Sequence, residues 1–463
     1  MADLTPMMQQ YMATKEQYKD CILFYRLGDF YEMFFDDALV ASKELEITLT
    51  GKNCGQEERA PMCGIPYHAA DSYLTKLVNK GYKVAICEQV EDPKLAKGIV
   101  KREVIRIVTP GTNLNMMSLE ESRNNYLMCI AYTEDKIGIA VVDALTGDFY
   151  VTEVSDTKKL NDEIVKFSPS EIICNDNFLV SGYSIDDLRE RLGISINKID
   201  AWHFEEDSCQ KLLCKHFKVN TLTALGVDDF MAGQIAAGAV LAYLYETQKN
   251  SLSNITHLNP YIASKYMLLD SATRRNLELT ETLREKQKKG SLLWVLDKTK
   301  TAMGARLLRT YLEQPLIEQA DIVLRQEAVG DLLAHPMSRE ELREYLSPIY
   351  DLERLLGKIS YKTANPRDLI AFRNSLQMLP PIKTVLADSD DIPTLIFDEI
   401  DTGISGRTAQ KVSEKLSYIA KSHQVICITH LPQIAAMADE HFEIAKKTDH
   451  QITRTQIRLL NEE

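Results

Sequence analysis

The chain has 463 residues, of which 45% are hydrophobic and 26% are charged. This length and composition are typical of a folded protein with three or four domains. The net charge of −13 argues against general binding of nucleic acids, although it leaves a local basic site open. One basic cluster lies near the end of the nearly neutral segment 1–110, and a solvated surface is its alternative interpretation: Lys94, Lys97, Lys101, Arg102 and Arg106.

The cysteines and the N-terminus indicate in which cellular compartment the protein is expected. The nine cysteines are scattered and form no CxxC pair, so the sequence favours a reducing cytosol and disfavours a zinc site. The first 20 residues lack the basic and apolar regions of a signal peptide. The most apolar long stretch, residues 230–244, is interrupted by polar and Gly residues and is too short to span a membrane. We therefore expect no membrane association.

The most informative stretch near the N-terminus is residues 28–37. It follows an alternating apolar segment, residues 21–26, that predicts a half-buried strand, and Gly28-Asp29 is typical of a turn. In an extended segment, Phe30 and Glu32 point to the same face. An aromatic ring beside a hydrogen-bonding group suits insertion against a base and contact with its edge. The alternative is a core strand with one solvated glutamate.

Further elements are expected to complete a small mixed α/β unit over residues 1–112. Asp36 or Asp37 is expected to cap the next helix, and Asp71 or Ser72 the helix after it. The expected elements are a helix over 38–45, a strand over 47–50, a long loop over 51–68, a helix that ends at Gly81, and strands over 84–87 and 100–108.

A second α/β unit, over residues 125–250, and a helical region are expected to follow. Short β segments separated by turn residues predict antiparallel strands over 126–132, 137–143 and 147–154. The Ala-rich segment 230–246 is apolar on nearly every side and predicts a buried helix. Helical periodicity with many Leu, Arg and Glu residues predicts a helical bundle over 258–386.

The last part of the chain, residues 392–463, has a different character. Pro380-Pro381 is expected to break the preceding helix. The predicted elements are a strand over 394–397, a helix over 407–421 and a strand over 425–429. This order implies two parallel strands with a right-handed crossover, which end at the same edge of the sheet. Because ligands bind at that edge in open α/β sheets, Asp398, Glu399 and His430 are expected to converge.

Two long runs stand out in the N-terminal part, LFYRLGDFYEMFFDDA and PMCGIPYHAADSYLTKLVNKGYKVAICEQVEDP. They closely resemble the mismatch-recognition domain of the MutS family of DNA mismatch repair proteins. The likeness continues through DALTGDFYVTEV, LDSATRRNLELTETLR and YDLERLLGKISYKTANPRDLIAFRNSLQMLP, and it covers about residues 5–386. It implies a mismatch-recognition domain at 1–112, an α/β connector domain at 125–250 and part of a helical core domain at 258–386.

The resemblance assigns roles to two residues. In that family the Phe of the GDFYE motif wedges into the stack beside a mispaired base from the minor groove, and the Glu two positions later hydrogen-bonds the base. These roles fall on Phe30 and Glu32. The implied ligand is double-stranded DNA with mismatches or small loops. A homodimer and a mismatch-repair partner protein are further candidates, and the implied location is the bacterial cytosol, in association with the nucleoid.

The tail carries another set of motifs, IPTLIFDEIDTGISG followed by VICITHLPQIAAMAD. They resemble the C-terminal end of RecN, an SMC-like DNA repair ATPase, and thus part of an ABC-type ATPase head at 392–463. By this resemblance Asp398 helps to hold Mg²⁺, Glu399 polarises the attacking water and His430 senses the γ-phosphate of ATP. The other nucleotide-binding residues implied by the resemblance belong to a D-loop: Asp401, Ser405 and Gly406.

The chain contains neither a phosphate-binding loop, GxxxxGK[ST], nor an LSGGE-type signature. ATP hydrolysis by this class needs a cradle for the phosphates. ATP and Mg²⁺ are therefore cofactors of the resembled families, and we expect Glu399 and His430 to be catalytic only if another chain completes the ATPase head. Autonomous hydrolysis is not expected.

Three hypotheses about function follow. The first is a DNA mismatch repair protein that binds mispaired or distorted DNA through Phe30 and Glu32. The second is a RecN-like, ATP-dependent protein of double-strand-break repair. The third is a non-functional fusion, or an assembly artefact, of two repair genes, in which case the helical core is expected to expose apolar surface. The expected fold class is common to all three: α/β and α, multidomain.

Overall fold

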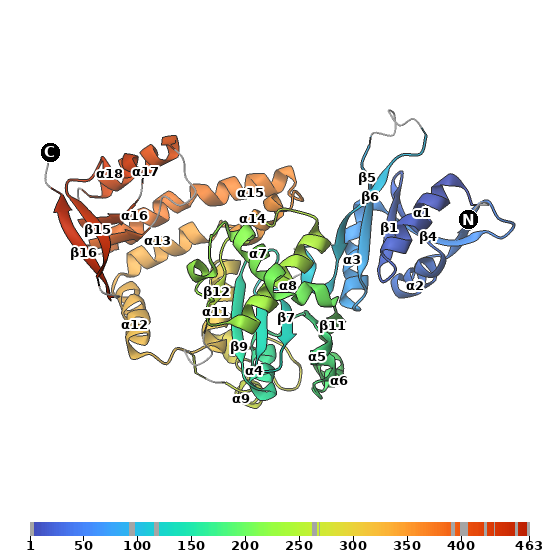
Figure 1. Cartoon of the computed structure of the whole chain (residues 1–463), viewed down its shortest axis with the longest axis horizontal. Helices are drawn as coiled ribbons and strands as arrows, with labels where there is room; N and C mark the ends of the chain where they lie inside the picture. The colour runs from blue at the N-terminus through green and yellow to red at the C-terminus, as the bar shows by residue number, and fades with distance from the viewer. Residues whose placement is uncertain are drawn as a thin grey trace. The chain divides into compact units, whose positions relative to one another are not determined.

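The computed structural model describes residues 4–91, 98–114, 120–261, 266–267, 269–389, 394–398, 406–420, 424–429, 431–449 and 452–460 (Figure 1). The chain divides into two compact units, Met1–Pro380 and Pro381–Glu463. The described part of the first unit holds two six-stranded sheets followed by helices, and that of the second holds two pairs of strands. The predicted fold class, α/β and α with several domains, is confirmed.

The first sheet occupies the N-terminal part of the chain, and its strand order is β3-β4-β2-β1-β5-β6. Its elements are α1 (Pro6–Gln17), β1 (Ile22–Leu27), β2 (Phe30–Phe34), α2 (Phe35–Leu45), β3 (Thr50–Lys52), β4 (Ala60–Pro66), η1 (Tyr67–Ala69), α3 (Ala70–Asn79), β5 (Val84–Gln89) and β6 (Arg102–Val108). Strand β2 pairs antiparallel with β1 on one side and with β4 on the other. The predicted strand before Gly28 and the extended segment after it are therefore confirmed.

Asp37 connects α2 to the sheet instead of capping α2. The helix has no side-chain cap hydrogen bond, so the predicted cap by Asp36 or Asp37 is wrong. The buried Asp37 carboxylate accepts hydrogen bonds from the Leu23 backbone N–H at 3.0 Å and the Tyr11 hydroxyl at 3.2 Å, and it pairs with the Lys15 ammonium at 2.8 Å. Burial, together with this carboxylate, raises the pKa of Tyr11. Asp37 thus stabilises the fold under the β1–β2 hairpin.

Three predictions between α2 and α3 are wrong. Residues 47–49 form no strand, and the expected loop over 51–68 contains all of β4 and most of β3. Gly and Pro residues favour turns, and they hide the strand pattern of this segment. Helix α3 begins at Ala70, so Asp71 and Ser72 lie inside the helix and neither caps it.

The second sheet has the order β11-β10-β7-β8-β9-β12. Its elements and the helices around it are η2 (Pro110–Thr112), β7 (Leu127–Tyr132), β8 (Ile137–Val142), β9 (Phe149–Val154), α4 (Thr157–Phe167), β10 (Glu171–Cys174), α5 (Asp176–Val180), α6 (Ile185–Leu192), β11 (Ser195–Lys198), η3 (Ala201–Phe204), α7 (Glu206–Phe217), η4 (Leu222–Leu225), α8 (Met231–Gln248) and β12 (Asn259–Pro260). Strands β7, β8 and β9 are antiparallel neighbours, as the turn signals between them predict.

Helix α8 packs against this sheet and is buried along most of its length, which confirms the predicted buried helix. It lies so close to β8 that a Cβ atom on Gly138 would be 1.9 Å from the carbonyl oxygen of Ala232. Only glycine fits at this position, because no backbone can move aside cheaply inside a packed sheet–helix layer.

Helices follow, and the last of them begins at the end of the first unit and continues into the second. They are α9 (Ser271–Asn276), α10 (Leu292–Leu296), α11 (Ala302–Glu313), α12 (Gln319–Ala334), α13 (Pro336–Leu346), α14 (Leu352–Ser360), α15 (Pro366–Gln377) and α16 (Leu379–Ser389). Helix α12 has no buried residue, and Leu324, Val329 and Leu333 are 66%, 59% and 64% exposed. Helix α15 ends at Gln377, shortly before Pro380 and Pro381, as predicted. The two prolines lie in the first turn of α16, where a missing N–H costs nothing.

Two buried arginines fasten the segment before β7 to the helices. The Arg354 guanidinium donates to the carbonyl oxygens of Glu120 at 3.0 Å and Arg123 at 2.6 Å. Arg306 donates to the carbonyl oxygen of Glu121 at 3.0 Å, and the Asp351 carboxylate holds Arg306 with two bonds of 2.7 and 2.8 Å. This paired geometry is specific to arginine.

Among its described residues, the second unit holds most of α16, two small strand pairs and two further helices. Its elements are β13 (Thr394–Asp398), α17 (Gly406–Ile419), β14 (Gln424–Ile428), α18 (Pro432–Ala435), β15 (His441–Asp449) and β16 (Ile452–Leu460). Strands β13 and β14 are parallel, as predicted, and β15 and β16 form an antiparallel hairpin.

Candidate nucleic-acid interface

Phe30 stands at the start of β2, directly after the two-residue turn of the β1–β2 hairpin. Leu27 pairs with Phe30 across that turn, and Gly28 adopts a φ of +57°, which a side chain would disfavour. Tyr31 and Met33 face the core, whereas the Phe30 side chain is 48% exposed. The alternative of an ordinary core strand therefore does not hold for Phe30.

Glu32 lies on the same face of β2 and is held by a lysine. The Glu32 carboxylate and the Lys52 ammonium form an ion pair at 2.5 Å, with side chains that are 16% and 33% exposed. Lys52 comes from β3, inside the segment that the sequence pattern predicts as a loop, so sequence reasoning missed it. The Lys52 ammonium also lies 5.6 Å from the centre of the Phe34 ring. The lysine thus fixes the orientation of the carboxylate and offsets its charge.

A shallow groove of about 600 Å³ runs beside Phe30 and Glu32. Gly64 of β4 lies opposite Glu32 in the sheet and lines the groove. A Cβ atom at Gly64 would be 3.6 Å from the Glu32 Cγ atom and 4.0 Å from the Phe30 ring. A large side chain at this position would therefore cover both residues, and glycine leaves their shared face open.

Tyr67, a second exposed aromatic residue, lies beside the turn of the β1–β2 hairpin. Its backbone N–H donates to the Asp29 carbonyl oxygen at 3.0 Å, and its side chain is 45% exposed. The Arg26 guanidinium carbon lies 3.8 Å from the centre of the Tyr67 ring, which is close enough for a cation–π contact.

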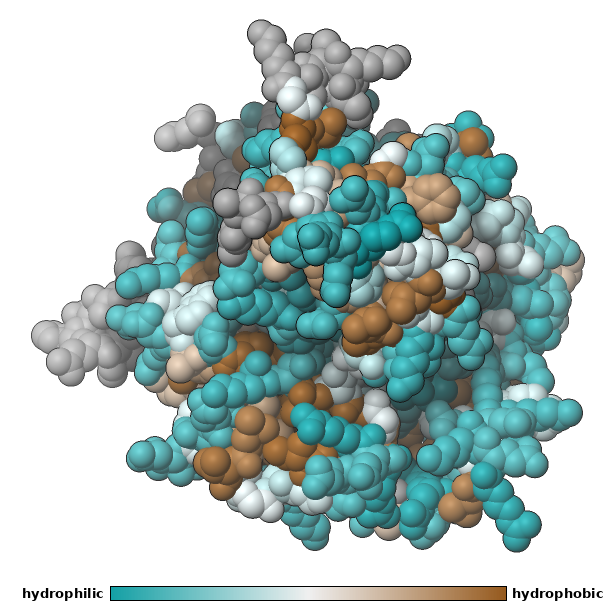
Figure 2. All heavy atoms as spheres, turned by 90° about the vertical axis from the view of Figure 1, so that its right-hand side faces the viewer, coloured by the Kyte–Doolittle hydropathy of each residue, from teal (hydrophilic) through white to brown (hydrophobic). Residues whose placement is uncertain are grey.

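On the side of the molecule that carries the N-terminal sheet, hydrophobic residues form separate patches among hydrophilic ones (Figure 2).

The predicted basic cluster is not a free patch within the described residues. Lys94 and Lys97 lie outside them. The Lys101 ammonium pairs with the Glu103 carboxylate at 2.6 Å. Arg102 donates to the Arg26 carbonyl oxygen at 2.7 Å and to the Gln10 amide oxygen at 3.0 Å, so it stabilises the sheet. The remaining member, Arg106, is half-buried on β6.

The residues predicted to bind nucleotide and Mg²⁺ lie mostly outside the described residues. These are Glu399, Asp401, Ser405 and His430. Asp398 ends β13, where its backbone pairs with Ile428, and Gly406 begins α17. Within the described part of the chain, no group of three or more His, Cys, Asp or Glu side chains could hold a metal ion. In that part, no helix is both long and apolar enough to cross a membrane.

Three domain families match the chain in order. MutS domain I matches residues 5–116, MutS domain II matches 125–256 and MutS domain III matches 272–447. The third match extends past residue 386, where the resemblance to MutS was expected to end. None of these matches supports the predicted RecN-like segment.

Curated relatives agree with the domain matches. The DNA mismatch repair protein MutS of Lachnoclostridium phytofermentans is 65% identical over 402 residues, which are 87% of this chain and 43% of that protein. The protein of the same name from Ruminiclostridium cellulolyticum is 54% identical over 389 residues, 83% of this chain and 44% of that protein. A third, from Acetivibrio thermocellus, is 53% identical over 406 residues, 87% of this chain and 46% of that protein.

The chain thus spans less than half the length of the curated relatives it matches. Over the residues matched, both the order of the domains and the degree of identity agree with one family. Over most of its length the chain therefore matches, in order, domains I, II and III of MutS proteins.

Proposed function

We propose that the chain is a DNA mismatch repair protein that binds duplex DNA at mispaired bases or small loops, and that Phe30 and Glu32 contact the base. The observation that carries this proposal is the Phe30 ring, 48% exposed at the start of a strand inside a sheet. A mispaired or unpaired base is easier to unstack than a paired one. An apolar wedge therefore selects weak base steps without reading the sequence.

Glu32 suits the second part of this contact. A free carboxylate beside DNA is repelled by the phosphates, but the Lys52 ammonium at 2.5 Å offsets that charge. The carboxylate then remains available as a hydrogen-bond acceptor for a base edge that is not engaged in a Watson–Crick pair. Gly64 leaves the space over both side chains open to the DNA.

The test is a competition between duplexes that differ only at one position. At low ionic strength, where phosphate contacts are strongest, we expect the purified chain to bind a duplex with one mismatch or one unpaired base about tenfold more tightly than the matched duplex, a difference of roughly 1.4 kcal/mol. Fluorescence anisotropy with an unlabelled competitor measures both affinities. Equal affinities for the two duplexes would contradict the proposal.

The Lys52–Glu32 pair makes a separate prediction. Replacing Lys52 with methionine keeps the length of the side chain but leaves the Glu32 carboxylate without its ion-pair partner. We expect the affinity for the mismatched duplex to fall about tenfold, because the unpaired carboxylate then faces the phosphates. Combining Lys52→Met with Glu32→Gln removes that charge, and part of the affinity is expected to return. A double-mutant cycle by anisotropy measures the coupling. Strictly additive effects of the two changes would contradict this role for Lys52.

A second candidate function rests on the parallel pair β13 and β14. Its register sets Asp398 opposite Ile428, two positions before His430. In a RecN-like ATPase head, Asp398 would hold Mg²⁺ and Glu399 would activate water at this edge of the sheet. The chain has no phosphate-binding loop, so turnover of ATP requires a second chain that supplies one. ATP turnover that Glu399→Gln abolishes is the measurement that tests this candidate.

The proposed function also suggests partners and a location. We propose a homodimer, a mismatch-repair partner protein and the bacterial cytosol, in association with the nucleoid. The names of the relatives, all DNA mismatch repair proteins, support the DNA partner. Light scattering of the purified chain, with and without mismatched duplex, tests the homodimer.

A further inference from the structure

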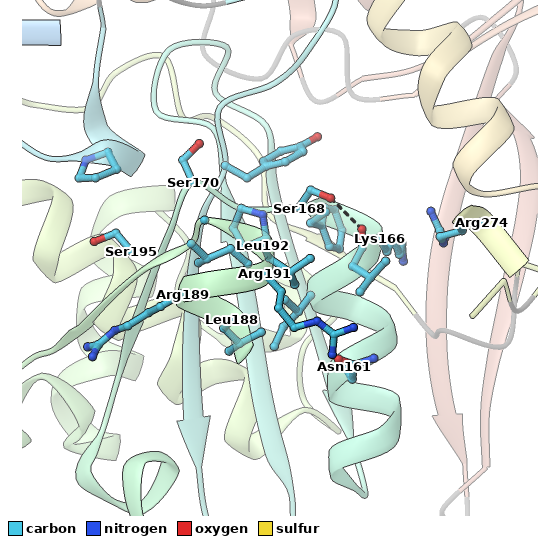
Figure 3. Close-up of a pocket in the computed structure, with 18 of the residues that line it drawn as sticks. Asn161, Lys166, Ser168, Ser170, Leu188, Arg189, Arg191, Leu192, Ser195 and Arg274 are labelled. Carbon is cyan, nitrogen blue, oxygen red and sulfur yellow. Dashed lines mark hydrogen bonds between the residues drawn. The ribbon is translucent and has the colours of Figure 1, made fainter. Parts of the chain in front are cut away.

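A wide cleft of about 1960 Å³ lies in the first unit and shares no lining residue with the groove beside Phe30. Helices α4 and α6 line it, and so do α9 and α11. Figure 3 shows Lys166 of α4 and Arg274 of α9 pointing toward one another. Sites for small ligands enclose roughly 300–1,000 Å³, so the cleft has room for a ligand of the size of a nucleotide.

The cleft concentrates positive charge. Its described lining residues include eleven Lys or Arg and five Asp or Glu, although the whole chain has a net charge of −13. A concave protein wall focuses the field of such charges and raises the local concentration of anions. The cleft thus carries an excess of positive charge, whereas the composition of the chain predicts a negatively charged surface on average.

Several of these cations are not neutralised by protein carboxylates. Within the described residues, six of the eleven form ion pairs. The other five form none: Lys158, Arg189, Arg274, Arg275 and Lys286. Arg274 donates only to main-chain oxygens, those of Leu269 at 2.9 Å and Glu313 at 2.6 Å. Neutral carbonyl oxygens orient the guanidinium but leave its charge available to a ligand.

Arg309 adds a buried guanidinium with one unused donor. The residue is 8% exposed, its Nε atom has no hydrogen-bond partner, and its contact with the Glu313 carboxylate is long, at 3.5 Å. Burial raises the pKa of Glu313, against the opposing effect of Arg309, Arg274 and Arg123. Three guanidinium groups thus act on a single carboxylate, and a buried donor without a partner is costly unless a ligand satisfies it.

We infer that this cleft binds a soluble anion with several linked phosphates, a nucleoside triphosphate or an inorganic polyphosphate, through Arg274, Arg309, Lys158 and Arg275. The positive groups are spread over several helices, which matches an extended row of phosphates better than a single one. Binding depends on the phosphates and not on a base, because the groups that carry the excess charge are cations. It is independent of Phe30 and of the tail.

The test is a calorimetric titration of the full chain with sodium tripolyphosphate, ATP and inorganic phosphate in separate arms. We expect tripolyphosphate and ATP to bind at one site with similar affinity, and inorganic phosphate to bind at least about tenfold more weakly, because it engages fewer charge-assisted hydrogen bonds. Binding of ATP without binding of tripolyphosphate, or of neither, would overturn the inference.

Two sets of variants locate the site. Lys158→Gln with Arg275→Gln removes two exposed cations of the cleft and is expected to weaken tripolyphosphate binding about tenfold. The matched control, Lys211→Gln with Lys215→Gln, removes two exposed charges from α7, away from the cleft, and is expected to have little effect. Equal losses for the two pairs would show a general charge effect and would contradict the site.

Glu313→Gln is expected to increase the affinity for tripolyphosphate. Damage to the fold would decrease this affinity, so an increase cannot be explained by misfolding. The change removes the carboxylate that competes for Arg309, and tripolyphosphate is expected to bind several-fold more tightly. Unchanged or weaker binding by a variant that melts at the wild-type temperature would count against the role of Arg309.

Discussion

Replacing Phe30 with alanine is expected to abolish the preference for mismatched DNA. The side chain is 48% exposed, so its removal should leave the stability of the N-terminal sheet nearly unchanged. Loss of one aromatic ring that stacks on a base costs about 1–3 kcal/mol, which corresponds to a roughly tenfold to hundredfold loss of affinity. Anisotropy is expected to show this loss for the mismatched duplex and little change for the matched one.

Two control variants separate this effect from a general one. Phe30→Trp keeps an aromatic ring and is expected to retain part of the preference. Trp202→Ala removes an aromatic side chain that is 54% exposed in the second sheet domain, away from the hairpin, and is expected to have no effect. An unchanged preference in Phe30→Ala would remove the central support of the proposed function.

Replacing Gly138 with alanine is expected to be the most destabilising small change in the second sheet domain. The new methyl group would lie 1.9 Å from the Ala232 carbonyl oxygen, so β8 and α8 must separate. Overpacking of this kind costs about 3 kcal/mol or more when backbone must move. The fluorescence of Trp202 reports on the position of α8. The Trp202 ring stacks on the His203 ring with 3.7 Å between ring centres, and His203 Nε2 lies 3.0 Å from the carboxylate of Glu246 in α8.

The measurement is urea unfolding followed by tryptophan fluorescence. In a Trp294→Phe background, Trp202 is the single tryptophan of the chain, and its transition reports on this domain. Gly330→Ala is the matched control, since Gly330 lies in α12 with no atom within 4 Å of a Cβ. Its transition is expected at the wild-type urea concentration. A transition for Gly138→Ala within experimental error of wild type would contradict the close packing.

Local patterns were sufficient to predict much of the fold. Alternation and turn residues predict the hairpin before Phe30 and the three antiparallel strands of the second sheet, because both depend on neighbours in the sequence. The apolar segment at α8 likewise indicates its own burial. The parallel pair β13 and β14 follows from the length of the crossover between them.

Other parts of the site depend on contacts between distant residues. Lys52 reaches Glu32 only because β3 and β4 fold over β2, and the Gly and Pro residues of that segment suggest a loop instead. Asp37 has the residue type and position of a helix cap, yet its carboxylate binds Lys15 and the Leu23 backbone. In both cases the role of the residue depends on partners that are distant in the sequence, and a short stretch of sequence does not contain them.

Strand β2 is hydrogen-bonded to a neighbour on each side. The backbone that carries Phe30 is therefore ordered before DNA arrives, and the protein has little conformational entropy left to lose on association. The cost of forming the complex then falls on the DNA, which has to bend and unstack at the contacted step. Affinity for one and the same mismatch should accordingly follow the flexibility of the flanking base pairs, with pyrimidine–purine steps the easiest to deform.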